Sequence, residues 1–133
     1  MALTHVPGKV SRSDRRRRPV PVRFLVDTGA VFTVLPETVW RAIGLKAERA
    51  AEFTLADGTA IRRDVSECRI QVEGRAATSP VVLGGPSDAP LLGAVTLETL
   101  GLMVNPLTRE ILPMRLMLSR ASGRSWVPAP LPS

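Results

Sequence analysis

The sequence predicts an all-β domain with one or two short helices. Many short apolar or alternating segments follow one another, and glycine, proline and Asp-Gly signals separate them at close spacing. Such spacing is typical of a β-barrel or a β-sandwich. The chain has 133 residues, 44% of them hydrophobic, and shows no internal repeat. This length suffices for one domain around one hydrophobic core.

The N-terminal part is polar and basic, and we expect residues 1–19 to form a flexible arm. Pro19 and Pro21 keep the following chain extended and favour an edge position for the first strand, Val22 to Val26. The folded domain is therefore expected to span residues 20–118, and residues 119–133, rich in Ser, Pro and Ala, are expected to form a flexible tail.

The next segments alternate between strand and turn signals. Val31 to Leu35 is predicted to be a strand, and Pro36 suits the first turn of a short helix that Gly44 can end. Asp57-Gly58 is a strong tight-hairpin signal, because a type I′ turn requires positive φ. The remaining expectations are strands at Glu52–Ala56, Thr59–Val65, Glu67–Glu73, Ala76–Leu83, Leu102–Asn105 and Glu110–Pro113, a helix from Val95 to Leu100 before Gly101, and an extension of the last strand over Met114–Leu118.

Composition excludes several kinds of chemistry. Cys68 is the only cysteine and His5 the only histidine, so an intrachain disulfide, a zinc site and Ser-His or Cys-His catalysis lack the necessary residues. We expect no metal and no cofactor. Met1 to Val10 lack the apolar stretch of a signal peptide, and no apolar run is long enough to span a membrane. We therefore expect a cytoplasmic location and no membrane partner.

The net charge of +6 is unevenly distributed. Acidic residues outnumber basic ones between residues 24 and 114, so the excess of basic residues lies near the two ends. The run Arg15, Arg16, Arg17 and Arg18 is typical of a solvated segment that contacts polyanions without sequence specificity. No specific nucleic-acid partner is expected.

The most informative segment is Phe24 to Pro36, in which Asp27 lies between two apolar stretches. A carboxylate in apolar surroundings costs free energy unless it is hydrogen-bonded, paired or used in catalysis. An ordinary turn is the simpler interpretation of Asp-Thr-Gly. The flanking segments are, however, too apolar for a surface turn.

Three elements together resemble the retropepsin-like aspartic proteases, the single-domain retroviral type. They are the triplet Asp27-Thr28-Gly29 with Ala30, the Asp57-Gly58 hairpin, and Leu91-Leu92-Gly93 before a helix. The resemblance covers residues 20–118. It implies a closed β-barrel with one lobe per chain, and an active site completed by a second copy.

The resemblance also implies a role for each motif. Asp27 from each of two chains would form a dyad that shares one proton, in which one carboxylate activates a water and the other protonates the substrate. Thr28 would hydrogen-bond to the partner loop, and Gly29 and Ala30 would complete the active-site loop. Residues Ala56, Asp57, Gly58 and Thr59 would form the tip of a flap over a peptide bound as an added strand, and Leu91, Leu92 and Gly93 would cross behind the loop.

The chain departs from the retroviral pattern in places. Retroviral members often carry a buried Asp–Arg pair where this chain has Val31 and Ala94, which favours a more apolar groove. The flap contains only Gly58 at its tip. The basic start of the chain leaves Glu110 to Leu118 as the expected basis of the dimer.

Two functions of different classes therefore stand beside each other. The first is a homodimeric aspartic endopeptidase that depends on Asp27. The second is a catalytically silent module that keeps the fold and binds peptides or dimerises. A third, weaker possibility is polyanion binding through the arginine run at residues 15–18.

Overall fold

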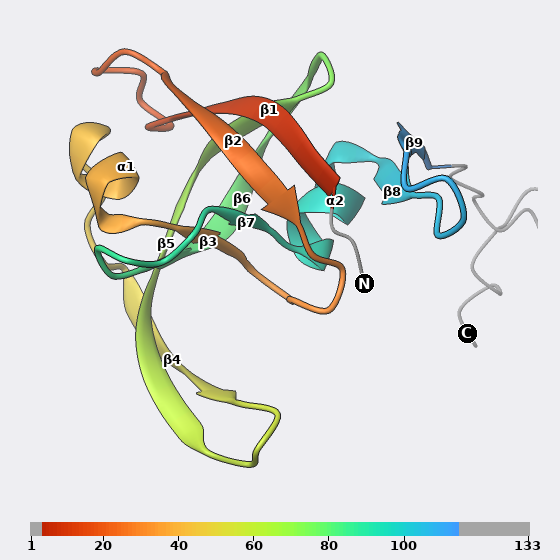
Figure 1. Ribbon diagram of the computed structural model, residues 1–133. Coiled ribbons are helices and arrows are strands. Elements are labelled where there is room, and N and C mark those ends of the chain that lie inside the picture. Colours follow the sequence, from red (N-terminus) through yellow and green to blue (C-terminus); the bar gives the residue numbers. More distant parts are fainter. Residues whose placement is uncertain (1–3, 115–133) are drawn as a thin grey trace, which may run out of the picture.

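The computed structural model describes residues 4–114 and contains nine strands and two short helices within that range (Figure 1). The predicted strand extension beyond Met114 and the predicted tail at 119–133 lie outside the described residues. The strands are β1 (Thr4–Ser11), β2 (Val20–Val26), β3 (Thr33–Leu35), β4 (Arg49–Thr54), β5 (Ala60–Val72), β6 (Arg75–Leu83), β7 (Leu91–Leu92), β8 (Leu102–Val104) and β9 (Ile111–Pro113). The helices are α1 (Glu37–Ala42) and α2 (Ala94–Leu100).

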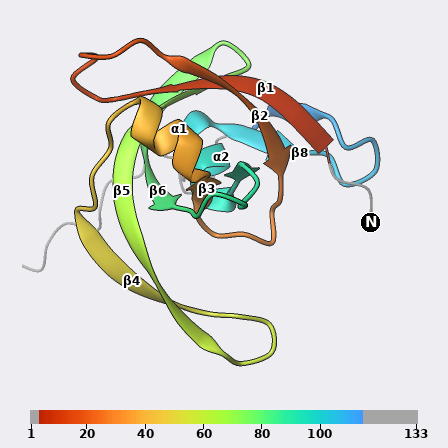
Figure 2. The same ribbon diagram turned by 60° about the vertical axis from the view of Figure 1, so that its left-hand side comes forward.

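Six strands close into a barrel in the order β1-β2-β7-β3-β6-β5, and β1 pairs with β5 to complete it. The predicted all-β barrel is thereby confirmed. β4 pairs only with the first part of β5, and this hairpin extends away from the barrel (Figure 2). β8 and β9 form a separate two-stranded sheet after α2.

The prediction of a flexible arm over residues 1–19 is wrong for Thr4–Ser11, which form β1. Val6 and Val10 point into the core and are 3% and 0% exposed. β1 pairs along its length with β2, and its second half pairs with β5. Two apolar side chains on one face of a strand that has hydrogen-bonding partners on both sides outweigh the polar composition of the segment.

Strand β2 is not at an edge, contrary to the expectation drawn from Pro19 and Pro21. It pairs with β1 on one side and with β7 on the other. The parallel pairing with β7 involves only Leu25 and Val26. Pro21 therefore has no neighbouring strand on that side, and its missing N–H removes no bond there.

The hairpin turns that contain Gly58 and Gly74 have different backbone conformations. At Asp57-Gly58 only Gly58 has positive φ, and the Gly58 N–H donates to the Leu55 carbonyl at 2.9 Å. This is a three-residue connection in which the glycine follows a type I turn, so the predicted type I′ geometry is wrong here. Glu73 and Gly74 both have positive φ, and the two-residue type I′ connection lies there, between β5 and β6.

Strand β5 joins two segments that the sequence suggested were separate. Its first part pairs with β4 and its second part with β6, and the change of partner occurs at Val65. One continuous strand therefore belongs both to the hairpin and to the barrel wall.

The buried Cys68 gives a pH-dependent prediction. Its side chain is 0% exposed, and burial, reinforced by the nearby Glu67 carboxylate, raises the pKa of this thiol to about 12. An unfolded thiol loses its proton near pH 8.5. Between these values the unfolded chain binds fewer protons than the folded one, so stability falls as pH rises, by at most about 1.4 kcal/mol per pH unit.

Urea unfolding at pH 7.5 and pH 10 measures this effect, with Cys68→Ala as the control. From the lower to the higher pH, the natural chain is expected to lose about 1–2 kcal/mol more than the variant. Equal losses in both chains would show that the thiol proton does not contribute.

Candidate active site

Asp27 lies directly after β2, in a turn built by its own side chain. Its Oδ1 accepts a hydrogen bond from the Gly29 N–H at 2.9 Å, and its carbonyl accepts one from the Ala30 N–H at 3.0 Å. The Asp27 N–H donates to the Leu92 carbonyl of β7 at 3.1 Å. The carboxylate is thus fixed in a half-buried position at the end of a barrel strand, with Oδ2 free of bonds to the described residues.

The turn is supported from behind by the segment that leads into α2. The Ala94 and Val95 N–H groups donate to the Ala30 and Val31 carbonyls at 2.8 and 3.0 Å. These donors belong to the first turn of α2, where no partner exists within the helix. The start of α2 therefore holds the Asp27 loop by its backbone.

Gly93 makes this close approach possible. A Cβ at position 93 would lie 2.5 Å from the Phe32 carbonyl carbon and 2.8 Å from the Val31 carbonyl oxygen. The segment Leu91, Leu92 and Gly93 thus passes close to the backbone of Val31 and Phe32. Only glycine leaves room for two backbones at this distance.

A buried chain of hydroxyl groups lies beneath the loop, and sequence reasoning missed it. Thr33, Thr96 and Ser79 are at most 1% exposed. Thr33 Oγ1 lies 2.6 Å from Thr96 Oγ1, which lies 2.7 Å from Ser79 Oγ. The chain connects β3, α2 and β6, the three elements around the loop.

The direction of these hydrogen bonds follows from counting protons. Thr33 Oγ1 accepts from the Gly93 N–H at 3.0 Å, and Ser79 Oγ donates to the Pro80 carbonyl at 3.2 Å. Because each hydroxyl has one proton, Thr96 must donate to Ser79, and Thr33 must donate to Thr96. Every hydroxyl donates once and accepts once, and bonds aligned in this way strengthen one another.

Replacing Thr96 by Val is therefore expected to destabilise the fold by about 2 kcal/mol or more. The shape is preserved, but the Thr33 hydroxyl loses its acceptor and Ser79 loses its donor, and each buried unpaired group costs about 1–3 kcal/mol. Chemical denaturation measures the change, and Thr99→Val, on the exposed side of the same helix, is the control. Equal stability of the natural and Thr96→Val chains would contradict the assigned chain.

A groove of about 400 Å³ lies beside the loop and is mainly apolar. Phe32 and Phe53 meet there edge to face, with ring centroids 5.8 Å apart. Val31, which also lines the groove, is 60% exposed. Retroviral members often carry a charged residue at this position. The lining residues are Gly29, Ala30, Val31, Phe32, Val34, Phe53, Thr54, Leu55, Ile61, Arg63, Val82, Asp88, Ala89 and Leu91.

The predicted flap is the β4–β5 hairpin, but its tip does not reach the groove. The tip residues Ala56, Asp57, Gly58 and Thr59 are exposed, whereas the groove is lined by residues before and after them. Hydrogen bonds from the Thr59 side chain and the Thr59 N–H hold the pKa of Asp57 below its usual range. The tip is thus a self-contained turn, and the arms of the hairpin carry the contacts with the groove.

Thr28, Gly29 and Ala30 complete the loop. Thr28 is exposed, and its hydroxyl makes no hydrogen bond to the described part of the chain. Residues 4–114 contain no group of three His, Cys, Asp or Glu side chains that could hold a metal ion. Among the same residues no helix is long and apolar enough to span a membrane.

The signals that could have revealed the missed residues are weak. Thr33 is a hydroxyl residue inside an otherwise apolar strand. Ser79 directly follows Thr78, and Thr96 is three residues beyond Gly93 in a short helix. Buried hydroxyl groups require partners. A sequence, however, does not show which of its many Ser and Thr residues are buried.

Comparisons with known proteins agree with this geometry. The family model of the gag-polyprotein putative aspartyl protease matches residues 18–99, and no curated protein sequence matches the chain. Among solved structures, the solution structure of the Simian Foamy Virus (mac) protease is similar with a TM-score of 0.52 and 18% identity, covering 71% of this chain and 92% of that chain. This likeness supports the retropepsin-like fold. On the family match, the chain belongs to the gag-polyprotein aspartyl proteases, the retroviral type of aspartic protease.

Proposed function

We propose that the chain is an aspartic endopeptidase whose active site forms between two copies, each supplying Asp27. The observation that carries this proposal is the position of Asp27, fixed by the Gly29 N–H beside an apolar groove. Family membership supports protease activity in general. Each chain provides one such loop, and single-lobe proteins of this kind need a second loop to complete a dyad.

The chemistry follows from two carboxylates that face each other. Two like charges at short distance cannot both ionise easily, so one carboxylate keeps a proton. The ionised Asp27 takes a proton from a bound water, whose oxygen attacks the peptide carbonyl carbon. The protonated Asp27 of the partner subunit donates its proton to the carbonyl oxygen. The Asp27 that took the proton then gives it to the amide nitrogen, while the partner's Asp27 takes a proton from a hydroxyl of the tetrahedral diol. The C–N bond breaks, the acid and the amine are released, and the dyad again holds one proton.

The groove supports binding of an extended peptide. A peptide in this position can lie along the β4–β5 hairpin as an added strand, with alternate side chains directed into the groove. The aromatic pair Phe32 and Phe53 and the exposed Val31 favour apolar side chains there. Transfer of an apolar side chain from water into such a groove is favourable.

Cleavage of a diverse peptide pool between pH 4 and pH 7 tests the proposal, with Asp27→Asn as the matched variant. Cuts that require Asp27 and that a pepstatin-like inhibitor blocks would support it. Cuts that persist in the variant would come from another source and would contradict it.

The second candidate function is a silent module that binds peptides without cutting them. The tip of the flap favours this alternative, because it stands away from the groove and has one glycine. A chain that dimerises and binds peptides at high concentration, yet cuts none of them, would support the silent module.

A further inference from the structure

The loop between β1 and β2 carries the arginine run and has a defined conformation. The Arg15 N–H donates to the Arg12 carbonyl at 3.0 Å, and the Arg16 N–H donates to Asp14 Oδ1 at 3.0 Å. Arg15 has a φ of 56°, a conformation that side-chain-bearing residues rarely adopt. The loop is thus a turn organised by Asp14.

The carboxylate of Asp14 is engaged by two of the arginines. It lies 2.8 Å from the Arg12 guanidinium and 3.7 Å from that of Arg16. The hydrogen bond from the Arg16 N–H, with the two guanidinium charges, holds the pKa of Asp14 below its usual range. Asp14 therefore remains charged and is paired on one side of the loop.

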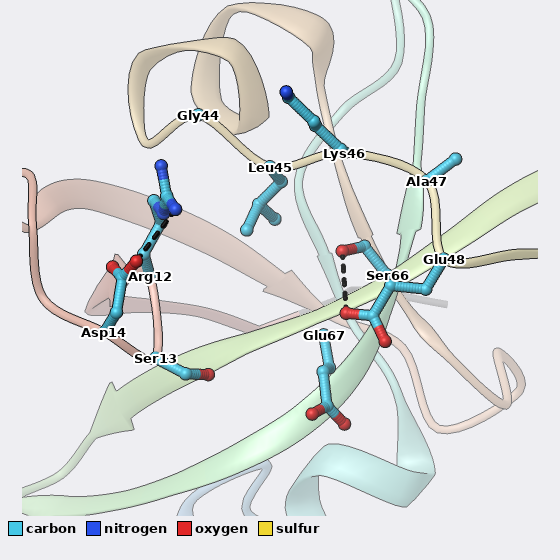
Figure 3. A pocket seen from close by; sticks show the side chains of 10 residues that line it. All are labelled: Arg12, Ser13, Asp14, Gly44, Leu45, Lys46, Ala47, Glu48, Ser66 and Glu67. Carbon is cyan, nitrogen blue, oxygen red and sulfur yellow. Dashed lines mark hydrogen bonds and ion pairs between the residues drawn. The ribbon is translucent and has the colours of Figure 1, made fainter.

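The hollow on that side has mixed charge (Figure 3). It encloses about 430 Å³ between the loop, the segment after α1 and β5. Its lining contains the cations Arg12 and Lys46 and the carboxylates of Asp14, Glu48 and Glu67. In Figure 3 Arg12 is paired with Asp14, whereas the Lys46 side chain points away from the carboxylates. Ions of both signs in one hollow leave little net potential for a charged ligand.

A second hollow beside the loop is different, since its charged lining is entirely basic. It encloses about 350 Å³ and is lined by Lys9, Ser11, Arg15, Arg17, Pro19, Arg69 and Gln71. The β1–β5 pairing produces this arrangement, because it sets Lys9 opposite Gln71 and Ser11 opposite Arg69.

The four cations of this basic hollow have no acidic partner among the described residues. Within residues 4–114 the ion pairs are Arg12–Asp14, Arg16–Asp14 and Arg41–Glu37. Arg17 Nη1 donates hydrogen bonds to the Arg41 and Ala42 carbonyls at the end of α1, at 3.4 Å each, and these neutral acceptors leave its charge uncompensated. A concave surface lined by one sign of charge concentrates the potential and attracts ions of the opposite sign.

The residues that line the hollow favour contacts with phosphate groups over base stacking or insertion into a membrane. Arginine forks and a lysine match phosphate oxygens, whereas an aromatic platform for base stacking is absent from this lining. The large apolar side chains exposed in the described chain are Val31, Leu55, Met103 and Leu107. None of them borders this hollow, which therefore lacks the apolar anchor of a membrane-binding surface.

We propose that the basic hollow binds the phosphate backbone of nucleic acid without sequence specificity. Contacts to phosphates position a protein on a strand but do not read bases. This binding site lies on the loop side of the barrel and does not depend on the proposed protease activity. The Asp27→Asn chain is expected to bind nucleic acid as tightly as the natural chain.

Fluorescence anisotropy of a labelled 20-nucleotide oligothymidine tests the proposal, with the full chain titrated at 50, 100 and 200 mM KCl. The variant Lys9→Gln/Arg69→Gln removes two strand-borne cations, and deletion of residues 1–19 is unsuitable because it would remove β1. We expect affinity to fall about tenfold or more, and the slope of log K against log salt to become shallower by about 1.4.

A second variant and a matched control distinguish the effect of cations in the hollow on binding from the effect of the net charge of the whole chain. Arg15→Gln/Arg17→Gln should reproduce the loss without altering a strand. Arg49→Gln/Arg62→Gln removes the same charge from the exposed β4–β5 hairpin and should bind as the natural chain does. An equal loss in this control would overturn the proposal. So would absence of oligonucleotide binding at 50 mM KCl, including the case in which vesicles containing phosphatidylserine bind instead.

Discussion

Mixing the natural chain with an excess of Asp27→Asn chain is expected to suppress peptide cleavage, although no natural chain is removed. If each active site needs one Asp27 from each of two copies, a mixed dimer has one carboxylate and one amide. The amide can neither take a proton from water nor return one to the carbonyl oxygen. We expect turnover by the mixed dimer to be about 10³-fold lower than turnover by the natural dimer.

Random exchange of subunits makes the effect quantitative. In an equal mixture, roughly half of the natural chains have a variant partner, so activity per natural chain should fall to about one half. With a ninefold excess it should fall to about one tenth. The Asn side chain has nearly the same shape, and its Oδ1 can still accept from the Gly29 N–H, so the variant should fold and pair normally.

Cleavage of a fluorogenic peptide, read after the mixture has equilibrated, measures this suppression. Chains carrying Glu73→Gln, in the turn between β5 and β6, form the control. These chains keep Asp27, so activity per chain that carries Asp27 should stay unchanged, and total activity should rise in proportion to the chain added. Activity that stays constant while the Asp27→Asn chain is added would show that one chain suffices, and would rule out a shared dyad.

The substitution Gly93→Ala is expected to destabilise the fold by about 3 kcal/mol or more. Its new Cβ would lie 2.5 Å from the Phe32 carbonyl carbon and 2.7 Å from the Phe32 carbonyl oxygen. These are backbone atoms, and the Ala30 and Val31 carbonyls nearby are bonded to the start of α2. The crossing cannot open without breaking those bonds, so the cost exceeds that of ordinary overpacking.

Thermal or urea unfolding of the variant measures this cost, and Gly85→Ala is the matched control. At position 85 the nearest heavy atom to an added Cβ is Asp88 Oδ2, at 3.7 Å, which is an ordinary contact. The control should remain within about 0.5 kcal/mol of the natural chain. A Gly93→Ala chain of natural stability would mean that the two segments do not approach as closely as described.

Local signals made most of the barrel predictable. Asp27-Thr28-Gly29 lies between strands as expected, and Gly101, with a φ of 71°, ends α2 where the sequence placed the end of a helix. These features depend on residues adjacent in sequence. Glycine in a left-handed conformation and an apolar strand beside a turn are visible without knowledge of distant partners.

The features that were missed depend on partners far along the chain. β1 is stabilised by pairing with β2 and with β5, which lies more than fifty residues away in sequence. Its polar and basic composition alone therefore led to the wrong prediction of a flexible arm. The chain Thr33–Thr96–Ser79 joins three separate elements. Gly58 was correctly assigned to a turn, but the turn type depends on the exact pairing of Leu55 with Thr59. Such information resides in the tertiary structure.

The continuity of β5 has a mechanical consequence for the groove. β5 has 13 residues, a length of roughly 40 Å. Val65 divides it into an outer part, in the hairpin, and an inner part, in the barrel wall. At this residue the partner changes from Arg49 of β4 to Val82 of β6, and Val65 itself is only 2% exposed. The outer part pairs with β4 alone and forms a two-stranded ribbon, which can twist. The inner part is hydrogen-bonded to β6 and, over its last residues, also to β1. We therefore expect any movement of the hairpin relative to the barrel to bend β5 near Val65, since no loop separates its two parts.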